Sequence, residues 1–70
     1  MTVKRLNEIA ERVDQIKMRY EMDEVEKIKY VDELLEFSEE LLRVPDNYKY
    51  FWLKQSVLHD INRVVIDLLK

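Results

Sequence analysis

The amino-acid sequence predicts an all-α protein, and three observations carry this prediction. The 70-residue chain contains no glycine, whereas the tight turns of β-hairpins favour glycine. Apolar residues recur every three or four positions along most of the chain, which is the period of an amphipathic helix. The one strong helix breaker is Pro45. We therefore expect a single domain, residues 1–70, folded as a small three-helix bundle with helices at about 3–21, 24–43 and 46–69.

An apolar stripe predicts the first helix. Its members follow one another at steps of three and four residues: Leu6, Ile9, Val13, Ile16 and Tyr20. The stripe lapses after this point, and Asp23 followed by Glu26 is typical of a capping box at a new helix start. Because no breaker lies between residues 3 and 44, one continuous helix of about 40 residues, about 60 Å long, is the alternative. It would give a long helical hairpin.

The second predicted helix has an apolar side that covers about half of its circumference at 100° per residue. This side holds Ile28, Tyr30, Val31, Leu34, Leu35, Phe37, Leu41 and Leu42, with Ser38 among them. One neighbouring helix needs a narrower stripe than this. We therefore expect the helix to lie between two others, either within the chain or in a bundle that dimerisation completes.

Pro45 ends the second helix, and Asp46 or Asn47 can cap the third. The main face of the third helix is predicted to bury Val57, Leu58, Ile61, Val64, Val65, Leu68 and Leu69, extended by Tyr50 and Phe51. A second, thinner line lies on the opposite side at spacings of four, seven and seven: Tyr48, Trp52, His59 and Ile66. Since tryptophan and tyrosine are enriched at binding hot spots, we expect this line to form a partner or dimer interface.

The charged side of the second helix supports an alternative hypothesis. It carries a row of carboxylates: Asp32, Glu33, Glu36, Glu39 and Glu40. Such a row can imitate the phosphates of a nucleic acid and occupy a basic groove on another protein. ExxE spacings also occur in metal-binding helices. The all-α nucleotide pyrophosphohydrolases follow that helix with an ExxD helix, however, and here the third helix offers only Asp60 and Asp67.

The composition argues against several classes of function. Without glycine there is no phosphate-binding loop, and without cysteine there is neither a disulfide nor a thiolate metal site. The single histidine, His59, has no nucleophile and orienting acid arranged around it, so we expect no enzyme, cofactor or metal site. The net charge is −3 with no basic patch, which argues against a nucleic-acid partner.

The sequence shows neither a secretory signal nor the roughly 20 apolar residues of a membrane span, so we expect a cytoplasmic protein without a membrane partner. The leading hypothesis is a non-catalytic α-helical interaction or regulatory module. Its expected partners are a second copy of itself, as a homodimer, and an unidentified protein.

Overall fold

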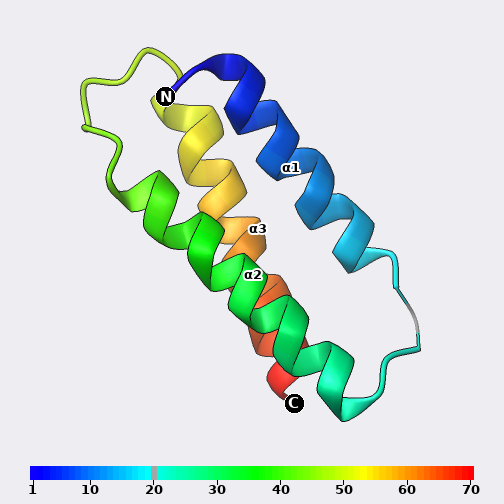
Figure 1. The fold of residues 1–70 in the computed structure, drawn as a ribbon. Helices are drawn as coiled ribbons and strands as arrows, with labels where there is room; N and C mark the ends of the chain where they lie inside the picture. Colours follow the sequence, from blue (N-terminus) through cyan, green and yellow to red (C-terminus); the bar gives the residue numbers. More distant parts are fainter. Residues whose placement is uncertain (20) are drawn as a thin grey trace.

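The computed structural model describes residues 1–19 and 21–70, and this part of the chain contains three α-helices and no strand. The helices are α1 (Val3–Lys17), α2 (Glu24–Leu42) and α3 (Phe51–Leu69). They run side by side as an elongated bundle of 39 × 16 × 15 Å, with the two termini at opposite ends (Figure 1). The predicted three-helix bundle is confirmed, and the continuous hairpin is wrong.

Helix α1 begins as its sequence predicts and ends earlier. The Thr2 hydroxyl accepts a hydrogen bond from the Arg5 backbone N–H at 3.1 Å, which satisfies one free donor of the first turn. The described members of the predicted stripe are all buried: Leu6, Ile9, Val13 and Ile16. The last turn tightens, since the Arg19 N–H bonds to the Ile16 carbonyl. The predicted end at residue 21 is wrong, and Tyr20 lies outside the described residues.

The break before α2 rests on a local cap. The Asp23 carboxylate accepts a hydrogen bond from the Glu26 N–H at 2.8 Å, and the Asp23 backbone is extended. Glu24 and Glu26 lie in the first turn, where acidic side chains favour the positive end of the helix dipole. This cap is the one predicted from Asp23 and Glu26.

The connection from α2 to α3 differs from the prediction. Helix α2 ends before Pro45 as expected, but α3 begins at Phe51 and not near residue 46. Neither Asp46 nor Asn47 caps it, because the N-cap is Tyr50, which makes no side-chain capping bond. Two successive turns occupy the interval, in which the Tyr48 N–H bonds to the Pro45 carbonyl and the Phe51 N–H to the Tyr48 carbonyl. These turns delay the helix and let the Tyr48 ring pack against the core.

The core is one continuous cluster drawn from all three helices. Its buried members are Leu6, Ile9, Val13, Ile16, Leu34, Leu41, Val57, Leu58, Ile61 and Val64. Helix α3 packs against both α1 and α2, which contact each other less extensively. The prediction that Leu69 is buried is wrong, since its side chain is 68% exposed. It lies at the end of α3, away from the side on which Ile61 and Val64 meet the core.

Candidate functional site

Three of the four residues of the predicted outward line lie at the surface of α3. Trp52 is 82% exposed and Ile66 is 59% exposed, and His59 is exposed between them. These three residues stand seven positions apart, so they share one side of the helix opposite the buried Ile61.

Tyr48 lies apart from this line because it precedes α3. Its ring packs against the core cluster and meets the Tyr50 ring edge-on, with 5.7 Å between ring centroids. The Tyr48 hydroxyl is buried and has no hydrogen-bond partner among the described residues. The structure therefore places Tyr48 in the packed connection between α2 and α3.

The predicted acidic row divides into two groups. Asp32, Glu36 and Glu39 are exposed. Glu33 and Glu40 are half-buried, and both bind arginines of α1. Arg12 donates to both carboxylate oxygens of Glu33, at 2.7 and 3.1 Å. Arg5 does the same to Glu40, at 2.9 and 3.2 Å.

A third pair extends these two into a ladder, and its arginine, Arg19, lies just beyond the end of α1. Arg19 donates to Glu26 at 2.9 Å and to the Tyr30 hydroxyl at 2.9 Å. Both rows step by seven residues in opposite directions, as two antiparallel helices require: Arg5, Arg12 and Arg19 against Glu40, Glu33 and Glu26. The apolar periodicity of the separate helices does not predict this ladder, although the matching seven-residue spacing of arginines and glutamates is the signal in the sequence that could have revealed it.

Aromatic rings on α2 reinforce the ladder. The Arg5 guanidinium lies 5.7 Å from the centre of the Phe37 ring, and Arg12 and Arg19 each lie 5.6 Å from the centre of Tyr30. The hydrogen bond that Arg12 donates to Glu33 raises the pKa of Arg12, and the hydrogen bond that Arg5 donates to Glu40 raises the pKa of Arg5, in both cases against a smaller desolvation effect. These glutamates are therefore engaged within the chain.

A row of exposed apolar side chains follows α2 on the flank opposite this ladder. Ile28, Leu35 and Leu42 are 63%, 47% and 68% exposed. Each stands two positions after a ladder glutamate, and two residues of helix turn the side-chain direction by about 200°. The row therefore lies on the flank of α2 that points away from α1.

Helix α3 presents the adjoining surface. Val64 and Asp67 line a hollow beside Ile16 and Lys17 of α1, so this flank of α3 faces α1. Ile66 stands two positions after Val64, and Leu69 stands two positions after Asp67. Both therefore lie on the flank of α3 that points away from α1. In a bundle of three, the flanks of α2 and α3 that point away from α1 form one surface. We call this surface the outer face, with the apolar members Ile28, Leu35, Leu42, Ile66 and Leu69.

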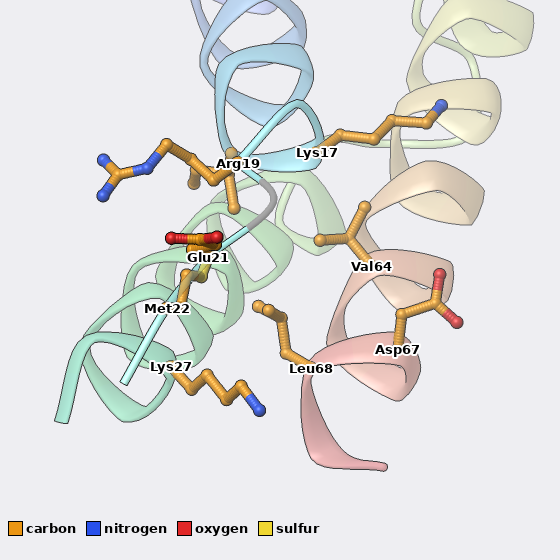
Figure 2. Close-up of a pocket in the computed structure, with 9 residues that line it drawn as sticks. Lys17, Arg19, Glu21, Met22, Lys27, Val64, Asp67 and Leu68 are labelled. Carbon is orange, nitrogen blue, oxygen red and sulfur yellow. The ribbon is translucent and has the colours of Figure 1, made fainter. Parts of the chain in front are cut away.

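The hollow beside α1 has a volume of about 450 Å³ and lies at the end of the bundle where α1 stops short. Figure 2 shows the apolar side chains of Val64 and Leu68 directed into it from α3. The charged groups do not converge, since the Arg19 guanidinium points away from Val64 and Leu68 (Figure 2) and is bonded to Glu26. The arrangement lacks the set of convergent polar groups typical of a small-molecule site.

The described residues contain no group of three or more His, Cys, Asp or Glu side chains arranged to hold a metal ion. None of the three helices is both long enough and apolar enough to cross a membrane, as far as the chain is described. No protein-family model, curated protein or solved structure matches the chain.

Proposed function

We propose that this chain is a non-catalytic α-helical interaction module that binds another protein chain through the outer face. The observation that carries the proposal is the row of large apolar side chains on α2, Ile28, Leu35 and Leu42, which the bundle leaves uncovered. Contiguous exposed apolar surface on a small protein is typical of an interaction site. The seven-residue spacing suits a helix packed along this row.

Trp52 supports the same proposal from the edge of this surface. Among the described residues it is the most exposed large hydrophobic side chain, and tryptophan contributes strongly where it is buried at an interface. A module that acts by binding also fits the regulatory role expected from the sequence. We further propose a cytoplasmic location, because a chain without cysteine needs no oxidising compartment.

Site-specific photo-cross-linking tests the proposal. A photoreactive amino acid is placed at position 35 of the outer face or, as the control, at position 17 on α1, and the protein is irradiated in cells. We expect defined protein adducts from position 35 that are absent from position 17 and reduced by Trp52→Ala. Absence of any adduct specific to position 35 would contradict the proposed function.

The alternative function, mimicry of a nucleic acid, has the exposed carboxylates of Asp32, Glu36 and Glu39 in its support. Glu33 and Glu40 contribute less to such a row because arginines already pair with them. The two functions differ in their salt dependence. Binding by mimicry collapses with added salt and with Glu36→Lys, whereas binding through the outer face is sensitive to Trp52→Ala and far less to salt.

A further inference from the structure

We infer that the outer face binds a second copy of this chain, with α2 of each copy packed antiparallel on α3 of the other. This inference rests on the proposed function and names the partner. It requires that the face be large enough, that its centre be free of charge, and that its two edges carry opposite charges.

The size of the face suits a dimer. A helix of 19 residues, the length of α2 and α3, is about 28 Å long, and two helices about 9 Å apart present a surface about 20 Å wide. This corresponds to a planar area on the order of 550 Å², and the accessible area of side chains exceeds the planar area. Standard interfaces bury about 800 Å² on each partner, so the face approaches what a stable dimer needs.

The centre of the face carries no charge. The α2 side consists of Ile28, Leu35 and Leu42. The nearest row of α3 has the same seven-residue spacing and consists of Gln55, Asn62 and Leu69, all exposed. Two copies can therefore meet without burying an unpaired charge, which would be costly.

The two edges of the face are complementary. The α2 edge carries the exposed carboxylates Asp32 and Glu39, with Arg43 at its C-terminal end. The α3 edge carries His59, Arg63 and Lys70, of which Lys70 lies 3.7 Å from Asp67 of the same chain. A two-fold axis parallel to the helices lays the α2 edge of one copy against the α3 edge of the other. A perpendicular axis would instead set the acidic edges against each other, where like charges disfavour contact.

The register of α2 and α3 makes the pairing specific. The Lys54 ammonium donates a hydrogen bond to the Val44 carbonyl. A residue of α2 and a residue of α3 whose numbers add to about 98 therefore lie at the same height along the bundle. Glu39 is then level with His59, and Leu35 with Arg63. In the dimer whose two-fold axis is parallel to the helices, Glu39 of one copy lies close to His59 of the other, and Trp52 lies just beyond the C-terminal end of α2 of the other copy.

Sedimentation equilibrium over a concentration series tests the inference. We expect a mass of twice 8.6 kDa at high concentration, and a dissociation constant at least tenfold higher for Leu35→Asp, which places a charge at the centre of the face. Val3→Asp is the matched control, because Val3 is also an exposed apolar residue but lies in the first turn of α1, away from the outer face, where an acidic residue is favourable. Circular dichroism checks that each variant keeps its helix content.

Charge reversal tests the arrangement of the two copies. We expect His59→Glu to weaken the dimer several-fold, because it sets a second carboxylate beside Glu39 of the other copy, and the double variant with Glu39→Arg to recover most of the loss. A wild-type chain that stays monomeric, or a dimer indifferent to Leu35→Asp, overturns the inference. Failure of the double variant to recover overturns the packing of α2 on α3. A monomer that nevertheless cross-links through position 35 to a different protein refutes self-association and leaves the proposed function standing.

Discussion

A buried lysine holds the connection between α2 and α3. Lys54 is 4% exposed, its ammonium donates to the Val44 carbonyl at 3.2 Å, and it lies 5.3 Å from the centre of the Phe51 ring. The hydrogen bond satisfies a carbonyl beyond the end of α2, and the aliphatic part of the side chain fills space beside the core. Lys54 therefore contributes to stability through both packing and a charge-assisted bond.

We expect Lys54→Ala to lower the free energy of unfolding by about 2 kcal/mol, because it leaves both a small void and a carbonyl without its partner. Lys54→Met keeps most of the volume and removes the buried charge, so we expect it to cost less than half as much. Urea denaturation followed by circular dichroism measures both. Equal losses for the two variants would show that the bond matters and the packing does not.

The placement of Tyr48 shows what sequence periodicity could not predict at the scale of one residue. Its spacing from Trp52 fits a continuous helix, and that spacing put it on the outward line. In the structure the helix begins three residues later, at Phe51, so the relation of 100° per residue does not extend to Tyr48. Packing of its ring on the core decides its position, and this contact joins residues that are distant in sequence.

At the scale of the helices, boundaries set by local chemistry were predictable. The Asp23 cap and the stop before Pro45 both depend on residues within four positions, and both are found as predicted. The end of α1 and the start of α3 were predicted wrongly, and the start of α3 follows a connection whose Tyr48 ring packs on the core. The antiparallel ladder could not be predicted from one helix alone, because each arginine forms its ion pair with a glutamate that is distant in the sequence.

We expect the middle pair of this ladder, Arg12 and Glu33, to couple by about 0.5 to 1 kcal/mol in a double-mutant cycle with alanine. Both side chains are partly exposed, at 39% and 30%, so solvent screens the pair and keeps the value in the range of surface ion pairs. The pKa of Arg12 is raised by its hydrogen bond to Glu33, so the contribution of the charged guanidinium is fully present below the ordinary pKa of arginine and is lost as the pH rises through the raised pKa.

The cycle is measured by urea denaturation at low salt and in 1 M salt. High salt should reduce the coupling, and Arg12→Lys should recover only part of it, because lysine cannot bond to both carboxylate oxygens in the same way. Coupling that is unchanged in 1 M salt would indicate packing of Arg12 on Tyr30 as its source.

At the scale of the whole molecule, the sequence predicted how much of the surface of α2 is apolar, but not which flank of α2 the other helices leave uncovered. An apolar half-circumference on α2 required two neighbours, and the bundle supplies α1 and α3. Ile28, Leu35 and Leu42 nevertheless stay exposed, because the ladder fixes α1 on the opposite flank of α2. Which flank stays uncovered depends on the handedness of the bundle, and the period of a single helix does not encode this.

Self-association through the outer face makes thermal stability depend on protein concentration. A ligand that binds only the folded chain raises the melting temperature, and here the second copy is that ligand. The concentration of folded monomer varies as the square root of the dimer concentration. A hundredfold increase in protein concentration therefore adds about 1.4 kcal/mol per chain to the free energy of unfolding. For a domain of this size this corresponds to a rise of about 5 to 10 °C. Leu35→Asp should melt at the same temperature at every concentration, whereas Val3→Asp should follow the wild type. A wild-type melting temperature that does not change with concentration would contradict the dimer.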